Sequence, residues 1–475
     1  MSSSPEETGV ANDTQETRNP RDDTTLYSDA VDTSRRSTGK RKLEKDTRLT
    51  STKKAKLDEH LTKQSAEKDA DTKQDDGDFN FINKPQYFCI LRLYEYFYYL
   101  SSNSRLKSLS GENEGQEGEQ NAGNTALVAE HYNALTEKGL TQRSQSRIVY
   151  MRNFNNWIKS MLINEYLGKA RQGKGHRAPF KVLDICCGKG GDLLKWRKAN
   201  ITHLICADIA EVSVEQCQSR YNDLLNKSSS NRGFAPVFTA EFIAADCTKV
   251  RLREKYKDAS CQLDLVSCQF AFHYSFESLQ QAECMLRNVG ESLRPGGYFI
   301  GTMPDACDLM SRWQKSDYQK FGNEVYSVEF QCEEKIRPPL FGAKYNFHLE
   351  GVVNCPEFLV HLPTLTKLAL KFGLEIVMFE RFEKFYNRMK DEGRSLLGKM
   401  RALETYPPCH EAPLLGQNPE DYKHAAQYMQ NSTGHRKIGT LSLPEWEATS
   451  LYAVFAFQKM KTTWNAEGKP EYSKL

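Results

Sequence analysis

The sequence lacks long apolar runs and regularly spaced cysteines. No stretch approaches the roughly 18 consecutive apolar residues of a membrane helix, so we expect no membrane span. The N-terminal MSSSPEETGVANDTQ has neither a basic region nor an apolar core, which argues against a secretory signal. The 13 cysteines form no CxxC pair and no zinc-finger spacing with histidine. We therefore expect reduced thiols of an intracellular protein and no metal site.

A strong charge of one sign is also lacking. The 65 Lys and Arg nearly balance the 62 Asp and Glu, and a formal net charge of +3 says little about a polyanionic partner. The charge is instead clustered in residues 1–78, which are poor in aromatic and branched residues and should be disordered. Their basic clusters GKRKLEK (39–45) and STKKAKL (51–57) are either a solvated tail or a nuclear localisation signal.

Residues 79–126 interrupt this pattern with an anomalous aromatic segment, FNFINKPQYFCILRLYEYFYYL, and a linker rich in Gly and Glu. A membrane span fits poorly, because Lys84, Pro85, Arg92 and Glu95 interrupt a run that is already too short. We assign this segment no function.

From residue 127 to 475 the chain has the pattern of a globular domain. Apolar residues at three- and four-residue spacing predict helices up to about residue 167. Strands then alternate with helices, which predicts an α/β fold with a doubly wound, mostly parallel sheet and helices on both faces. Two more strands follow a large insertion, which makes seven strands in all. The expected strands are 181–186, 203–209, 241–247, 263–272, 298–304, 374–382 and 450–459.

The first strand runs into a glycine-rich turn, KVLDICCGKGGDLLKW (181–196), which could hold one of three ligands. A nucleoside triphosphate is excluded, because Lys189 is followed by Gly190 rather than Ser or Thr. A dinucleotide is disfavoured, because Asp192 places a carboxylate where the pyrophosphate belongs. S-adenosylmethionine carries cationic groups and suits Asp184 at the end of this strand.

Acidic residues also end the next two strands. Asp208 is placed to bind ribose hydroxyls, and Asp246 is placed to accept from the adenine amino group. Any one of these acids could be a helix cap or a turn residue. Three at successive strand ends indicate a ligand, because open α/β sheets bind ligands there.

The chain over about 127–460 resembles the eukaryotic mRNA cap guanine-N7 methyltransferases. RNFNNWIK, CGKGGDLLKW and CQFAFHYSFES are the most specific segments, and AEHYN, FGNEVYSVEF, LEGVVNCPEFLV, DYKHAAQYM and GTLSLPEWEATSLYAVFAF agree. The resemblance implies a class I, Rossmann-like methyltransferase fold with an antiparallel final strand pair. It implies S-adenosylmethionine as cofactor, 5′-capped RNA (a GpppN end) as substrate, a small activating protein subunit and a nuclear location, without a membrane or DNA partner.

The resemblance also implies roles for individual residues. The cofactor set is Lys159, Cys186, Asp208, Asp246, Gln269 and Tyr274. The cap set is Asn155, Asn156, Lys189, Lys195, Arg220, His273, Glu357 and Tyr452. No catalytic residue is expected beyond positioning, because guanine N7 offers a lone pair and no proton, so no general base is needed.

Several of these residues have simpler interpretations. Lys189 and Lys195, at the start of one helix, and Arg220, at the end of the next, could be solvated surface charges instead of triphosphate ligands. Glu357 follows Pro356 and could be an acid in the first turn of a helix. His273, Tyr274 and Tyr452 could be core aromatics.

Cys186 departs from the family pattern, which has glycine there. We expect this cysteine to weaken cofactor binding without abolishing it, because glycine tolerates a positive φ. Two other functions remain open: a methyltransferase acting on a small molecule or a protein, and a non-catalytic interaction protein that binds the cap or cofactor weakly.

Overall fold

The computed structural model describes residues 124–134, 144–175, 178–230, 237–332, 335–410, 412–431 and 436–475. All of them belong to one compact unit, Ile82–Leu475. The predictions for residues 1–78, and for 79–123 of the aromatic segment and linker, lie outside the described residues. The first described helix, α3 (Asn124–Ala134), begins shortly before residue 127, where we expected the domain to start.

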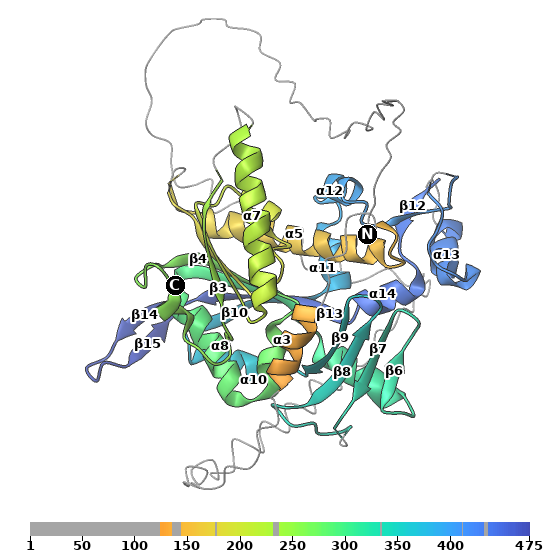
Figure 1. Cartoon of the computed structure of the whole chain (residues 1–475). Coiled ribbons are helices and arrows are strands. Elements are labelled where there is room, and N and C mark those ends of the chain that lie inside the picture. The colour runs from red at the N-terminus through yellow and green to blue at the C-terminus, as the bar shows by residue number, and fades with distance from the viewer. Residues whose placement is uncertain are drawn as a thin grey trace, which may run out of the picture. The chain divides into compact units, whose positions relative to one another are not determined.

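A seven-stranded sheet forms the centre of the fold, in the order β10-β13-β5-β4-β1-β2-β3 (Figure 1). The five strands from β3 to β5 are parallel, and β13 pairs antiparallel with both β5 and β10. The mostly parallel doubly wound sheet and its antiparallel final pair are therefore as predicted. The strands are β1 (Lys181–Ile185), β2 (His203–Asp208), β3 (Thr239–Ala244), β4 (Leu263–Gln269), β5 (Leu293–Pro304), β10 (Leu374–Arg381) and β13 (Tyr452–Lys459).

Helices cover both faces of this sheet because the central strands are apolar on both sides. Along β1, Val182 packs into the core beneath one face and Leu183 into the core beneath the other. Figure 1 shows α5 and α7 on one side of the sheet and α8 and α10 on the other. The helices are α5 (Val149–Arg171), α6 (Leu193–Lys198), α7 (Glu211–Ser230), α8 (Leu279–Ser292) and α10 (Leu362–Leu370).

The fifth strand starts earlier than expected. We predicted a Pro-Gly-Gly turn before residue 298, but β5 already begins at Leu293. The register against β4 shifts between the pairs Leu263↔Leu293 and Leu265↔Tyr298. Gly296 has a φ of 77°, which glycine adopts without steric cost. The Pro-Gly-Gly segment therefore forms an irregularity within the strand.

The expected insertion between β5 and β10 contains a second, four-stranded antiparallel sheet in the order β6-β7-β8-β9, preceded by α9 (Ala306–Lys315). Alternate side chains of β7 and β8 are buried, as in an antiparallel sheet with one solvated face. The strands are β6 (Lys320–Gly322), β7 (Tyr326–Phe330), β8 (Lys344–Leu349) and β9 (Val353–Phe358).

The segment between β10 and β13 is partly helical. A short strand pair, β11 (Glu404–Tyr406) with β12 (Ile438–Thr440), interrupts it. Its helices are α11 (Phe382–Met389), α12 (Arg394–Lys399), η4 (Pro419–Tyr422), α13 (Lys423–Asn431) and α14 (Leu443–Thr449). A hairpin of β14 (Lys461–Trp464) and β15 (Pro470–Ser473) follows β13. Among the described helices, none has the length and apolar character to span a membrane.

Candidate active site

A cavity of about 250 Å³ lies where β1, β2, β3 and β4 end. From β1 the chain adds strands on one side (β2, β3) and then on the other (β4, β5), so the strand order reverses beside β1. Ligands of open α/β sheets bind at such a switch point. The six residues of the predicted cofactor set all line this cavity, together with Asp184 and four residues of α3. The topology therefore brings together side chains that are far apart in the sequence.

The glycine-rich turn forms one wall of the cavity. Cys186, Gly188 and Gly190 have φ values of 59°, 51° and 74°, so three residues of this turn lie in the left-handed region that favours glycine. The Gly188 N–H donates to Asp208 Oδ2 at 2.8 Å, and the Ala210 N–H donates to Oδ1 at 2.9 Å. These bonds hold the β2 carboxylate beside the turn.

Asp208 is a buried carboxylate. Burial, and next the neighbouring Cys186, raise its pKa to about 7, although the two backbone donors favour the charged form. A buried carboxylate with spare acceptor capacity gains from a ligand that donates hydrogen bonds.

Asp246, which we predicted to accept from the adenine amino group, and Gln269 both line the cavity. Asp246 Oδ1 accepts from the backbone N–H and hydroxyl of Thr248, at 2.9 and 2.6 Å. Gln269 donates to Ser267 Oγ at 3.0 Å. The buried Oε1 of Gln269 has no hydrogen-bond partner among the residues the structure describes, which leaves an acceptor for a ligand. The donor and acceptor set therefore fits S-adenosylmethionine, whose hydroxyls and amino groups donate.

Lys159 lines the cavity, but its ammonium group binds a protein carboxylate. Lys159 Nζ lies 2.9 Å from Asp192 Oδ1, and Lys195 Nζ lies 2.6 Å from the same oxygen. Burial alone would raise the pKa of Asp192, but the two ammonium groups outweigh it and lower that pKa to about 2. Asp192 precedes α6 without capping it through its side chain. Asp192, the acid whose charge argued against a dinucleotide, thus links Lys159 of the cofactor set to Lys195 of the cap set.

A second group of polar side chains surrounds Glu357. Tyr345 donates to Glu357 Oε2 at 2.9 Å, and Tyr274 donates to Oε1 at 3.4 Å. His273 Nε2 lies 3.2 Å from Oε1, and Tyr132 contacts the Tyr274 hydroxyl at 3.4 Å. Burial, followed by nearby groups that include Glu357, raises the pKa of Tyr274 and Tyr345 well above its ordinary value, so both phenols remain donors.

Glu357 lies on β9 with an exposure of only 3 %. Its interpretation as an acid of a helical first turn is therefore wrong: the helix that follows, α10, begins at Leu362. The Tyr452 ring is also buried and stacks edge-on against Phe270 at a centroid distance of 5.1 Å, so it packs as a core aromatic beside this group.

The remaining residues of the cap set lie near α6. Asn156 Oδ1 accepts from Lys195 at 3.3 Å, and Asn155 Oδ1 accepts from Thr449 at 2.9 Å. Arg220 donates to the backbone oxygen of Lys189 at 2.8 Å. Our placement of Arg220 at a helix end was wrong, because α7 continues to Ser230. Lys189 lies in the turn before α6, not in the helix.

Sequence reasoning missed three polar residues of the two groups: Tyr132, Asp192 as an ion-pairing residue, and Tyr345. Tyr345 is paired with Glu357 in the β8–β9 register. The alternation of buried and exposed residues along β8 and β9 was the available signal that both side chains are buried. The turn that sets the register of the two strands could not be derived from the sequence.

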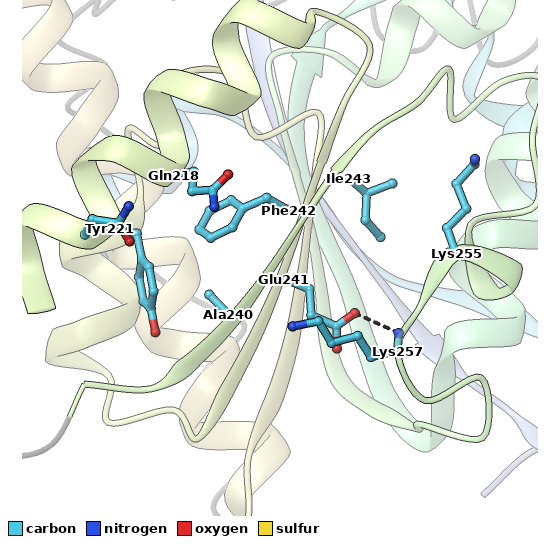
Figure 2. Close-up of a pocket in the computed structure, with 9 residues that line it drawn as sticks. Gln218, Tyr221, Ala240, Glu241, Phe242, Ile243, Lys255 and Lys257 are labelled. Atoms are coloured by element: carbon cyan, nitrogen blue, oxygen red, sulfur yellow. Dashed lines mark hydrogen bonds between the residues drawn. The ribbon is translucent and has the colours of Figure 1, made fainter.

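Another cavity, of about 310 Å³, lies along the edge strand β3. Figure 2 shows Tyr221 and Gln218 of α7 on one side of β3 and Lys255 on the other. Glu241 accepts there from the backbone N–H of Lys257 at 2.9 Å. None of the predicted site residues is among the described residues that line it, so we place the chemistry at the strand ends.

The doubly wound sheet, the glycine-rich turn and the acids at three successive strand ends define a class I S-adenosylmethionine-dependent methyltransferase. Residues 115–460 match the family model described as the mRNA (guanine-N(7))-methyltransferase domain. The chain therefore belongs to the mRNA (guanine-N7) methyltransferase family, with S-adenosylmethionine as its cofactor.

Individual relatives agree with this assignment. The chain is 55% identical to the mRNA cap guanine-N(7) methyltransferase of Drosophila melanogaster over 358 residues, covering 74% of this chain and 82% of that protein. It is 40% identical to the protein of the same name from Caenorhabditis elegans over 341 residues, with coverages of 70% and 87%. A solved S-adenosylmethionine-dependent methyltransferase from Clostridium acetobutylicum is 12% identical, with a TM-score of 0.33 and coverages of 70% and 98%.

Proposed function

We propose that the chain transfers a methyl group from S-adenosylmethionine to N7 of the 5′ guanosine cap of mRNA. Tyr274 carries this proposal: it lines the cavity of strand-end acids, and its hydroxyl contacts Glu357. A cofactor in the cavity and a base at Glu357 would therefore be neighbours. When bound, the cofactor supplies an electrophilic methyl group on a sulfonium centre.

Glu357 is suited to recognise guanine. Its carboxylate can accept about four hydrogen bonds, and Tyr274 and Tyr345 donate two. The remaining capacity matches the N1–H and amino donors of a guanine edge. Since Tyr274, Tyr345 and His273 contact Glu357, the carboxylate is held in place before the base arrives. We assign His273 and Tyr452 to the walls of this base site.

The basic residues beside the turn suit the triphosphate of the cap. Asp192 is one carboxylate between two ammonium groups, so the group with Lys159 and Lys195 keeps a positive charge. Arg220 donates to the backbone oxygen of Lys189 in the same turn, and Asn155 and Asn156 face α14 and Lys195. We assign these side chains to phosphate and ribose contacts of the cap. A neutral substrate would not require such a group of basic residues.

We assign no general base or covalent nucleophile, because guanine N7 has a lone pair and no proton. The chain's contribution is orientation: Asp208, Asp246 and Gln269 hold one reactant and Glu357 the other. Fixing two reactants in this way can lower a barrier by roughly 7–11 kcal/mol.

The test is incubation of the chain with GpppA-capped RNA and S-adenosylmethionine labelled in its methyl group, followed by nuclease digestion and chromatography of the cap. We expect label at guanine N7, none on uncapped RNA, and at least a tenfold loss of kcat/KM in Glu357→Gln, because a charged acceptor is lost. The matched control is Glu329→Gln, an exposed acid on β7 of the same sheet. Absence of label at N7 would refute the proposal.

We also infer a nuclear location and a small activating protein subunit. The basic clusters 39–45 and 51–57 support the nuclear location. Replacing their Lys and Arg by Ser in a fluorescent fusion should shift the fusion protein to the cytoplasm, and an unchanged nuclear signal would contradict this inference.

For the activating subunit, the insertion between β5 and β10 offers a surface, because it exposes Tyr318 and Ile336, at 77% and 81%. A small nuclear protein fraction should raise the rate of wild type more than that of Ile336→Asp, and equal responses would contradict this surface.

A further inference from the structure

The two adjacent cysteines of the turn face opposite sides of the sheet. Cys186 packs against the core beneath the face covered by α8 and α10, and Cys187 packs against the core beneath the face covered by α5 and α7. Each therefore meets a different set of buried thiols. Cys187 also lines the cofactor cavity, whereas the buried thiols that it meets are not among the described residues that line it.

Three thiols gather on the side of Cys187. The Sγ atoms of Cys187, Cys206 and Cys217 lie within 4.8 Å of one another. Cys206 on β2 and Cys217 on α7 are fully buried, and Cys187 is half-buried in the turn. Elements separated in the sequence converge here, so the cysteine spacing could not reveal the group.

The turn is built to admit this group. A Cβ atom added to Gly190 would lie 2.7 Å from Cys217 Sγ, so the glycine leaves the room that the sulfur occupies. Metal binding requires the thiolate form of these sulfurs.

We propose that Cys187, Cys206 and Cys217 bind one soft monovalent cation, Cu(I), as three thiolate ligands. Soft sulfur ligands select Cu(I), whereas hard cations prefer oxygen. Structural zinc takes four ligands, and among the described residues no fourth Cys, His, Asp or Glu joins the group. Metal–sulfur bonds of about 2.3 Å would place three sulfurs about 4 Å apart, which is compatible with sulfurs that all lie within 4.8 Å of one another. Binding releases the three thiol protons to solvent, and copper keeps its oxidation state.

Occupation of this site would act on the cofactor turn. The Cys187 N–H donates to Ala207 O at 3.1 Å, and its carbonyl accepts from Gly190 N at the same distance. The next residue, Gly188, donates to Asp208. An ion held by Cys187 therefore anchors the segment that positions the β2 carboxylate.

The experiment titrates the reduced full chain, without oxygen, against Cu(I) held by bathocuproine disulfonate, whose colour reports the copper it retains. We expect wild type to withdraw one equivalent and Cys217→Ser to lose at least tenfold in Cu(I) affinity. Cys186→Ser, adjacent in sequence but packed on the opposite face, and Cys409→Ser, at an exposed site, are matched controls that should bind as wild type does.

A circular dichroism melt checks that each variant is folded, and Cys187→Ser at the half-buried position is the substitute if Cys217→Ser does not fold. Alkylation and mass spectrometry with and without copper should show Cys187, the half-buried ligand, modified in the copper-free chain and protected in the copper-loaded chain. The proposal is overturned if wild type takes no copper, if Cys217→Ser and Cys187→Ser both keep wild-type affinity, or if Cys186 is protected instead. Loss of two of the three thiols without bound copper, reversed by a reductant, would mean disulfide formation and would also overturn it.

Discussion

Cys186 is an L-residue held in a conformation that favours glycine. Its φ of 59° lies in the left-handed region, which costs a residue with a Cβ atom roughly 1–2 kcal/mol. Its thiol interacts with the buried thiols of Cys247 and Cys268, which offsets part of this cost. Cysteine is small, so the turn keeps its path and the residue still lines the cavity.

We therefore expect Cys186→Gly to increase the free energy of unfolding by about 1 kcal/mol, because the strain at this residue is relieved. It should also tighten S-adenosylmethionine binding, because the backbone can approach the ligand. Urea denaturation and calorimetric titration measure the two effects. Cys186→Ala keeps the Cβ atom and serves as the control; if it gains as much as Cys186→Gly, strain is not the cause.

Asp208 predicts a pH dependence of cofactor binding. Burial, and next Cys186, raise its pKa to about 7, whereas an unfolded chain has an Asp pKa of about 3.9. Because the native state holds the extra proton, this residue makes the fold less stable as pH rises from about 4 to about 7. A carboxylate that accepts hydrogen bonds from two ribose hydroxyls must be ionised. Cofactor binding should therefore strengthen as the pH rises over about 6–8.

Calorimetric titrations with S-adenosylhomocysteine should give an affinity up to about tenfold weaker at pH 6 than at pH 8, since one pH unit below a pKa leaves about a tenth of a group ionised. Asp208→Asn should bind weakly at every pH and show little slope. A wild-type affinity that is constant across this range would disagree with a titrating Asp208 at the ribose.

At the scale of elements, the β8–β9 pair supplies both the carboxylate and its main donor. The register places Tyr345 directly opposite Glu357, and both side chains are buried. The small sheet thus contributes part of the proposed base site within one strand pair, whereas the residues assigned to the cofactor line the cavity at the ends of the main-sheet strands. This division predicts that the two functions can be separated by mutation.

Tyr345→Phe should lower kcat/KM for capped RNA by about tenfold, because one hydrogen bond to a charged group is worth roughly 1.5–3 kcal/mol. S-adenosylmethionine affinity should stay unchanged, since Tyr345 does not line that cavity. Methyl-transfer kinetics and calorimetry separate the two readouts. His348→Ala, at an exposed position of the same strand, is the control. Equal losses of cap activity and cofactor affinity in Tyr345→Phe would argue against a separate base site.

Helices and strands were predictable from the sequence where the local pattern of apolar residues determines them. The seven strands of the main sheet, including β10 and β13, follow from short apolar runs that alternate with helices. The strand-end acids followed from the same pattern, because parallel strands end at one edge. Glu357 could not be placed, since Pro356 signals a helix start as readily as a strand at this position. Asp192 and Arg220 acquire partners only through packing between elements.

At the scale of the whole molecule, an N-terminal helix completes a cavity formed by the central sheet. Asn124, Thr125, Val128 and Tyr132 of α3 line it beside the strand ends. Asn124 and Thr125 donate to Glu277 at 2.6 and 3.2 Å. These bonds attach α3 to η3 (Phe272–Glu277), the segment that also carries Tyr274. The family match begins at residue 115, before this helix.

Two truncations test whether α3 belongs to the binding site. A chain starting at residue 115 keeps the helix and should retain cofactor affinity and cap methylation within about twofold. A chain starting at residue 135 loses four cavity residues and both bonds to Glu277, so the cavity opens to water. We expect its S-adenosylmethionine affinity to fall by at least tenfold, because two hydrogen bonds of roughly 1 kcal/mol each and the apolar contacts of Val128 and Tyr132 are removed.

Calorimetric titration of both chains measures this effect, and a thermal melt shows whether the shorter chain remains folded. Asn124→Ala with Thr125→Ala in the full chain removes the bonds to Glu277 without deleting the helix, and should cause an intermediate loss of affinity. If the chain that starts at residue 135 is folded and binds the cofactor as tightly as the chain that starts at residue 115, α3 is not part of the cofactor site. The start of the functional domain would then lie after this helix.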